Sequence, residues 1–173
     1  MLTSGVTFFA AFVLMVVAII YFVGGYFVDL GLRRGSAEDP SAPPAIFRSA
    51  FEGNGSGLHP ASRPDFASEE WELQSFDGLR LLATHFSPER RSHQWVIIVH
   101  GYGCNQEYGW NYAEAYLEHG YEVVTPDLRA SGKSEGTYLT MGAMESRDIA
   151  AWTKRITEED PEARIVLHGV SMG

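Results

Sequence analysis

Several residue classes are scarce in this sequence, and each scarcity excludes a class of protein. A single cysteine, Cys104, excludes a fold held together by disulfide bonds. Lys and Arg number 13 against 22 Asp and Glu, so nucleic acid is excluded as the main partner, because phosphate binding requires a basic surface. Charged residues are entirely absent from positions 1–28. The net charge of −9 therefore belongs to residues 29–173.

The uncharged N-terminus contains an apolar run long enough to cross a lipid bilayer. Residues 6–28 are 23 uncharged residues, and a helix of that length spans about 35 Å against about 30 Å of hydrocarbon core. A cleaved signal peptide and a buried core helix are the alternatives. The first usually has a basic start and a shorter apolar stretch, and the second is rarely apolar on every side. We therefore predict a single transmembrane helix.

The positive side chains close to this run all follow it. Arg33 and Arg34 come directly after the run and none precedes it, so the positive-inside rule places the rest of the chain in the cytoplasm. Residues 29–69 are predicted to be a linker, because they are rich in Pro and Gly. The predicted organisation is thus a transmembrane helix (6–28), a linker (29–69) and a folded domain (70–173).

Apolar patterning from residue 70 onward predicts an α/β fold. Two alternating segments flank Asp77-Gly78, which is typical of an antiparallel hairpin. Short apolar runs at 94–99, 121–125 and 164–167 are typical of strands buried on both faces of a parallel sheet. With helices between these runs, the order predicts a mostly parallel sheet of the form hairpin then βαβαβ. Ligands bind such sheets beyond the carboxyl ends of the strands.

Two helices are expected between the parallel strands. The first covers residues 111–119, where aromatic and apolar residues share one side. The second is expected to start at Thr140, a potential cap, and to carry Lys154 and Arg155 in its last turn.

Each predicted parallel strand ends in residues that suit a reactive site. The third is followed by Gly-Val-Ser-Met-Gly at 169–173, a G-x-S-x-G turn that would expose Ser171. The first ends in His100-Gly101-Tyr102-Gly103, which is either a backbone oxyanion site or a plain glycine loop. The second ends at Asp127, which suits a triad acid or, more commonly, a residue that organises its own loop.

Together these motifs resemble the N-terminal half of an α/β-hydrolase of the serine esterase, lipase and peptidase kind, in particular membrane-anchored bacterial members. The motifs are HGYG, PDLRASGKSEG and LHGVSMG, in that order. The resemblance implies Ser171 as nucleophile, the backbone N–H groups of Tyr102 and Met172 as oxyanion hole, and a structural role for Asp127 and Gly132. It implies an ester, thioester or amide substrate, and the anchor favours lipidic esters. No metal cluster or nucleotide fingerprint occurs, so no cofactor is expected.

The other two members of a catalytic triad do not follow the serine. In this family acid and histidine come after the nucleophile, whereas Gly173 ends the sequence two residues after Ser171. Of the upstream histidines, we expect His168 to pack within its strand, His100 to order the glycine loop and His119 to lie at a helix end. Activity is therefore expected only in a longer chain that supplies acid and histidine. The alternative is a non-catalytic membrane-tethered module or a truncated fragment.

Two smaller expectations complete the interpretation. Cys104 follows the glycine loop, and a buried inert thiol is favoured there over a reactive one. Residues 70–173 expressed alone are expected to be insoluble or partly folded, because the last strand would form an apolar sheet edge.

Overall fold

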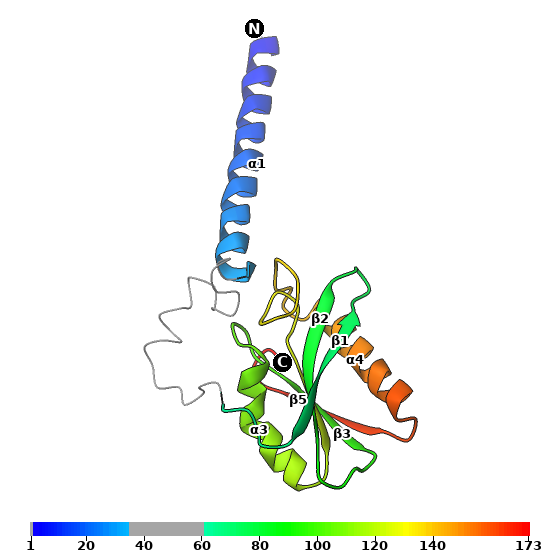
Figure 1. The fold of residues 1–173 in the computed structure, drawn as a ribbon. Helices are drawn as coiled ribbons and strands as arrows, with labels where there is room; N and C mark the ends of the chain where they lie inside the picture. Colours follow the sequence, from blue (N-terminus) through cyan, green and yellow to red (C-terminus); the bar gives the residue numbers. More distant parts are fainter. Residues whose placement is uncertain (1, 35–60) are drawn as a thin grey trace.

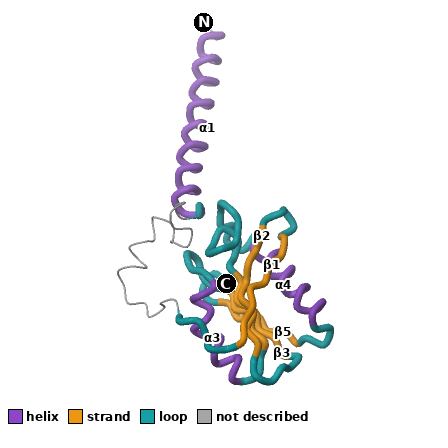
Figure 2. Tube along the Cα trace, viewed as in Figure 1, coloured by secondary structure: helices purple, strands orange, loops and turns teal. Residues whose placement is uncertain are grey.

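The protein combines one long helix with a five-stranded sheet flanked by two helices (Figures 1 and 2). The computed structural model describes residues 2–34 and 61–173. Its elements are α1 (Leu2–Leu32), β1 (Ala67–Gln74), β2 (Arg80–Ser87), β3 (Gln94–Val99), α3 (Gln106–Glu118), β4 (Glu122–Pro126), α4 (Glu145–Glu159) and β5 (Arg164–Gly169).

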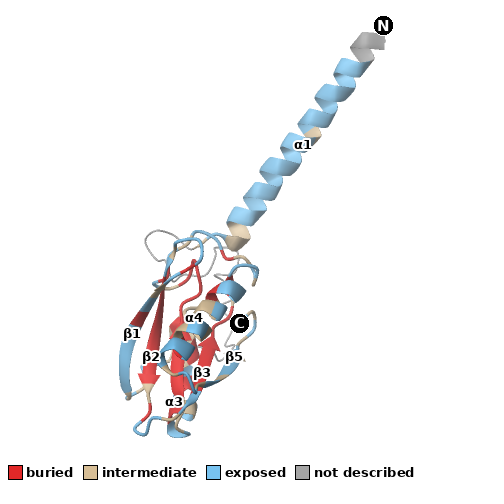
Figure 3. Cartoon of the chain, turned by 90° about the vertical axis from the view of Figure 1, so that its right-hand side faces the viewer, coloured by how far each residue is buried: buried red, intermediate tan, exposed pale blue. Residues whose placement is uncertain are grey.

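Helix α1 extends away from the sheet and is exposed along most of its length (Figure 3). The segment Val6–Leu32 is long and apolar enough to cross a membrane, and none of its most apolar stretch is buried against the protein. Within the described residues, α1 is therefore not covered by the rest of the fold as a core helix would be.

The sheet has the predicted mixture of antiparallel and parallel pairing. Its strand order is β1-β2-β4-β3-β5. Strands β1 and β2 form the expected hairpin, and β2 pairs antiparallel with β4. Strands β4 and β5 both run parallel to β3. The carboxyl ends of three strands therefore meet at one edge of the sheet, which confirms the predicted fold class.

Alternate residues of the central strands are buried against helices on opposite faces of the sheet. In β3, Trp95 and Ile97 belong to a core cluster with Trp152 of α4. The intervening Val96 and Ile98 belong to a second cluster with Ala113 and Leu117 of α3. Burial on both faces explains why β3 is apolar at consecutive positions.

Strand β5 departs from this pattern. We predicted burial on both faces, but its Val166 and Leu167 side chains are 40% and 59% exposed. Within the described residues β5 pairs with β3 alone, so it is the outermost strand on this side of the sheet.

The helix boundaries differ from the sequence-based expectations. Helix α3 begins at Gln106, five residues earlier than expected, because the Asn105 side chain caps it by accepting a hydrogen bond from the Glu107 N–H (3.1 Å). Thr140 does not cap α4, whose N-cap position is Met144. Instead Thr140 precedes the helix and its hydroxyl donates to the Glu145 carboxylate (2.6 Å).

The last turn of α4 and the predicted linker also need correction. Helix α4 continues to Glu159, so no basic residue lies in its last turn and Lys154 and Arg155 lie before it. The linker predicted at 29–69 is shorter, because residues 29–32 continue α1 and residues 67–69 belong to β1. Its centre, residues 35–60, lies outside the described residues.

Candidate active site

The turn after β5 holds Ser171 in a strained backbone conformation. Gly169 lies opposite Val99 in the parallel β3–β5 register, and the Val170 N–H donates to the Val99 carbonyl (3.0 Å). Ser171 then adopts a φ of 57°, in the left-handed region. This conformation costs a non-glycine residue about 1–2 kcal/mol and persists only where neighbouring structure enforces it. Its position at a strand end suits a side chain that must stand clear of the sheet.

Both glycines of the G-x-S-x-G motif are required by close backbone contacts. A Cβ atom on Gly169 would collide with the carbonyl of Gly173, and one on Gly173 would collide with the carbonyl of Val99. The turn is closed by a hydrogen bond from the Gly173 N–H to the Val170 carbonyl (3.0 Å). The motif therefore reflects a turn packed tightly against the end of β3.

The glycine-rich turn after β3 lies directly beside the serine turn. A Cβ atom on Gly101 would lie 3.2 Å from the Cβ of Ser171 and 3.7 Å from its Oγ. The absence of a side chain at Gly101 thus lets the two turns approach. The fold brings the predicted site residues Tyr102, Ser171 and Met172 into two adjoining turns, as the order of strand ends had indicated.

His100 fixes the glycine-rich turn from within the core. The side chain is buried, its Nδ1–H donates to the Gly101 carbonyl (2.8 Å), and its Nε2 accepts from the Leu128 N–H (3.1 Å). Burial lowers the pKa of His100 to about 4, so the imidazole is neutral at pH 7. These contacts match the predicted ordering role and join the loops after β3 and β4.

Asp127 organises the loop after β4 with both carboxylate oxygens. Oδ1 accepts from the backbone N–H of Gln106 (2.8 Å), and Oδ2 accepts from the backbone N–H of Lys133 (2.8 Å) and the Gln106 side-chain amide (3.1 Å). A Cβ atom on Gly132 would collide with this carboxylate. Burial raises the pKa of Asp127. This geometry favours the loop-organising alternative over a triad acid.

The remaining described histidines bond to groups outside the serine turn. His168 lies beside Tyr116, with 3.0 Å between Nδ1 and the phenolic oxygen, and His119 Nδ1 donates to the Ala115 carbonyl (2.7 Å). His85 and His93 interact with carboxylates of Glu122 and Asp160. His59 lies outside the described residues.

Neither the state of Cys104 nor a metal-binding cluster points to a second centre within the described residues. Burial raises the pKa of the Cys104 thiol to about 11, which favours the inert thiol. Within residues 2–34 and 61–173, no group of three His, Cys, Asp or Glu side chains could hold a metal ion.

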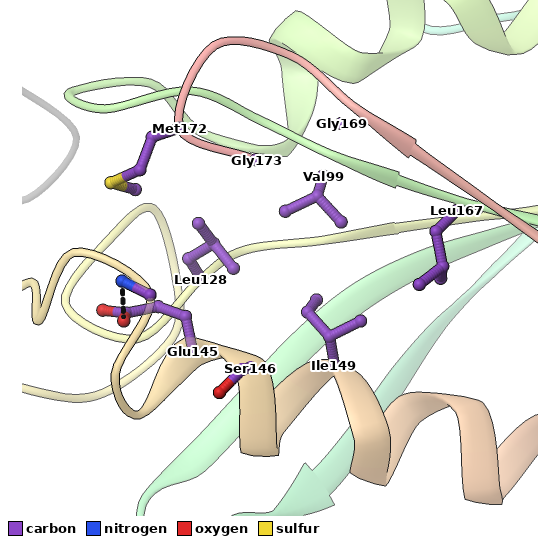
Figure 4. A pocket seen from close by; sticks show the side chains of 10 residues that line it. Val99, Leu128, Glu145, Ser146, Ile149, Leu167, Gly169, Met172 and Gly173 are labelled. Carbon is purple, nitrogen blue, oxygen red and sulfur yellow. Dashed lines mark hydrogen bonds between the residues drawn. The ribbon is translucent and has the colours of Figure 1, made fainter.

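A cavity of about 440 Å³ flanks the serine turn on the side of α4 (Figure 4). Met172 and Leu128 lie toward one end, and Ile149 of α4 and Leu167 of β5 lie toward the other. The Glu145 carboxylate at its rim is occupied by hydrogen bonds, including one from the Gly142 N–H (2.8 Å). The volume falls within the usual range for small-molecule sites, and the walls are mainly apolar.

The end of α1 packs on the same edge of the sheet. The Leu139 N–H donates to the Leu32 carbonyl (2.8 Å), and the Arg34 N–H donates to the Thr137 carbonyl (2.7 Å). The Arg34 guanidinium donates to the carbonyls of Gly132 (2.5 Å) and Ser134 (2.6 Å). No sequence pattern predicts this contact, because backbone pairing between segments about 100 residues apart leaves no motif.

Comparisons with known proteins agree with this architecture. Residues 90–173 match a family model described as serine aminopeptidase, S33. A search of the curated proteins finds no match.

Solved structures similar to this chain are α/β-hydrolases and esterases. An esterase from Pyrococcus furiosus is 34% identical in one crystal form, with a TM-score of 0.58 over 62% of this chain and 43% of that one. In a second crystal form the same esterase is 30% identical, with a TM-score of 0.59 over 66% of this chain and 47% of that one. A serine hydrolase without a lid from Xanthomonas campestris shares the fold at 22% identity, with a TM-score of 0.52 over 65% of this chain and 55% of that one.

The chain spans about half the length of these structures. The strand order, the paired turns at the strand ends and these matches together place the chain in the α/β-hydrolase superfamily.

Proposed function

We propose that the whole protein is a membrane-anchored serine hydrolase that cleaves an ester, thioester or amide through an acyl-enzyme on Ser171. The observation that carries this proposal is the left-handed Ser171, held against Gly101 of the glycine-rich turn. A strained serine at this strand end is the arrangement expected for a nucleophile. The esterase similarity favours an ester as the substrate.

The proposed reaction has two steps. Ser171 Oγ attacks the carbonyl carbon and gives its proton to a base, while the backbone N–H groups of Tyr102 and Met172 stabilise the negative oxygen. The bond to the leaving group breaks, and the base returns the proton to that group. Water then attacks the acyl-serine, which releases the acid and regenerates Ser171.

The base and its acid are the unassigned parts of this mechanism. His119 and His168 are bonded to groups away from Ser171, and both ring nitrogens of the buried His100 are occupied by the Gly101 carbonyl and the Leu128 N–H. We therefore propose that a longer chain supplies the histidine and the acid. The same observation favours the second candidate function, a membrane-tethered module that has kept the scaffold without catalysis.

Covalent labelling separates the two candidates. The full-length gene product should react with a fluorophosphonate probe, and Ser171→Ala should reduce labelling at least tenfold. Ser146→Ala is the matched control, because this exposed serine lies on α4 near the same cavity and should label like the wild type. Absence of labelling in the full-length protein would support the non-catalytic module, and labelling that survives Ser171→Ala would exclude Ser171 as nucleophile.

We further propose that α1 anchors the protein with the folded part in the cytoplasm. The support is the exposed apolar span Val6–Leu32 and the position of Arg33 and Arg34 after it. The protein should remain in the membrane fraction after alkaline carbonate extraction. A protease should digest the folded part in inside-out vesicles and not in right-side-out vesicles; the reverse pattern would overturn the orientation.

A further inference from the structure

A second cavity lies between α1 and the glycine-rich turn. Its volume is about 390 Å³, which is within the range of small-molecule sites. Its walls are uncharged, and come from the end of the apolar helix and from two loops of the folded part: Phe27, Val28, Gly31, Leu32, Tyr102 and Met141. A cavity of this composition suits a hydrocarbon group and offers nothing to a charged one.

One residue of the cavity wall, Tyr102, directly follows the glycine that packs against the serine turn. That glycine, Gly101, contacts Ser171. The Tyr102 hydroxyl donates a hydrogen bond to the Gly31 carbonyl of α1, so the two walls are held together. A group in this cavity would thus lie next to the backbone that is proposed to bind the oxyanion.

The helix is bonded to this edge of the sheet. Besides the backbone pairs of Leu32 and Arg34, the Tyr138 hydroxyl donates to the Asp29 carboxylate (2.6 Å). Figure 1 shows the loop that carries Tyr138 and Met141 between the lower end of α1 and the sheet. These bonds therefore hold the second cavity at the end of the apolar span, beside the carboxyl edge of the sheet.

Several apolar and aromatic side chains are exposed around this cavity. The Phe27 side chain on α1 is 61% exposed and Met141 on the loop is 59% exposed, with Tyr138 and Met144 also exposed on the same loop. A tyrosine such as Tyr138 at the end of a membrane span suits the interface between hydrocarbon and water, because its ring is apolar and its hydroxyl is polar.

We infer that this cavity takes the long acyl chain of a membrane-resident ester, which enters from the bilayer and places its carbonyl at Ser171. This inference rests on the proposed function and adds the substrate class. The occupant is a hydrocarbon chain because the walls are uncharged, and it comes from the bilayer because four of the six lining residues belong to the end of the apolar span. A long acyl chain can fill these apolar walls whereas an acetyl group cannot, so long chains should be preferred over short ones.

The test fills the cavity from α1. Gly31 lines the cavity, and a Cβ atom there has no neighbour within 4 Å, so Gly31→Phe should occupy the space without straining the helix. Gly25→Phe is the matched control, because Gly25 has equally open surroundings on the same helix and does not line the cavity. Full-length protein in phosphatidylcholine vesicles is assayed with 4-methylumbelliferyl oleate and 4-methylumbelliferyl acetate.

Gly31→Phe should lower the ratio of oleate to acetate hydrolysis at least tenfold, and Gly25→Phe should leave it within twofold. A mid-chain photoreactive oleoyl ester should also crosslink to Tyr102 or Met141 in the wild type and lose this crosslink in Gly31→Phe. An unchanged ratio with acetate hydrolysis intact would overturn the acyl-chain site while the proposed function stands. If the wild type neither hydrolyses the acetate ester nor reacts with the fluorophosphonate, the proposed function itself is overturned.

Discussion

At the residue scale, Gly132 lies where a side chain would meet the buried carboxylate of Asp127. Its φ is +48°, and a Cβ atom would collide with the carboxylate. Gly132→Ala should therefore combine backbone strain with overpacking and lower the free energy of unfolding by about 3 kcal/mol. Gly120→Ala shares the positive φ (+81°) but has open space around its Cβ, so it should cost about 1 kcal/mol. Thermal unfolding in detergent, followed by tryptophan fluorescence, measures both; equal losses would show that the contact with Asp127 contributes nothing.

His100 predicts a dependence of stability on pH. Its pKa is about 4 in the folded protein against 6.5 in the unfolded chain, because burial disfavours the charged imidazole. Between these values the unfolded state binds more protons, so stability is complete above pH 6.5 and falls as the pH drops toward 4, by about 3 kcal/mol in all. His100→Gln can still donate to Gly101 and accept from Leu128, but does not titrate. The melting temperature of this variant should fall less between pH 6.5 and 4.5 than that of the wild type; parallel curves would refute the assignment.

The candidate site was largely accessible from sequence because its chemistry resides in short motifs. Glycines mark the two close turns, and Ser171 stands between two of them. The contacts of Asp127 with Gln106 and Lys133 were not accessible, since they depend on how the loops after β3 and β4 meet in space. The contribution of α1 to the edge of the sheet was also missed, because Arg34 was interpreted only as a topological signal.

At the element scale, a buried ion pair holds α4 against the loop after β4. Arg129 donates from Nε and Nη2 to the Asp148 carboxylate (2.7 and 2.8 Å), and both residues are buried. Its Nη1 also donates to Asp77 in the β1–β2 turn (2.9 Å), so three elements meet at one guanidinium. Such a residue fixes where the start of α4 lies relative to the serine turn.

Removing one partner of this pair should be strongly destabilising. Asp148→Ala leaves a buried guanidinium without its main partner and should cost about 3 kcal/mol. The double substitution Arg129→Met with Asp148→Leu should recover most of that loss, because no buried charge is left unpaired and the remaining Asp77 carboxylate is exposed to solvent. Lys133→Ala serves as control, since its 2.7 Å pair with Glu70 is exposed and should contribute less than about 1 kcal/mol. Chemical unfolding measures all three, and a double variant as unstable as Asp148→Ala would contradict the argument.

Element types were easier to predict than element ends. The apolar runs of β3 and β4 indicated buried strands because both faces of these strands are covered. Helix ends depend on local hydrogen bonds that periodicity does not report, so the cap at Asn105 was missed; α4 begins after Met144, which makes no capping side-chain hydrogen bond. The run in β5 has the same apolar character, yet neighbouring elements decide its burial, and the sequence of one strand does not encode them.

At the scale of the whole molecule, the exposed side of β5 should govern how the 173-residue chain behaves in solution. Leu167 is 59% exposed on an outermost strand of the described sheet, and such apolar edges favour association between chains. The chain in mild detergent should therefore self-associate with rising concentration, and Leu167→Lys should shift it toward the monomer by placing a charge at the edge. Thr157→Lys adds the same charge on the exposed face of α4 and should leave association unchanged. Analytical ultracentrifugation separates the outcomes: a monomeric wild type, or equal effects of the two lysines, would show that the β5 edge does not drive association.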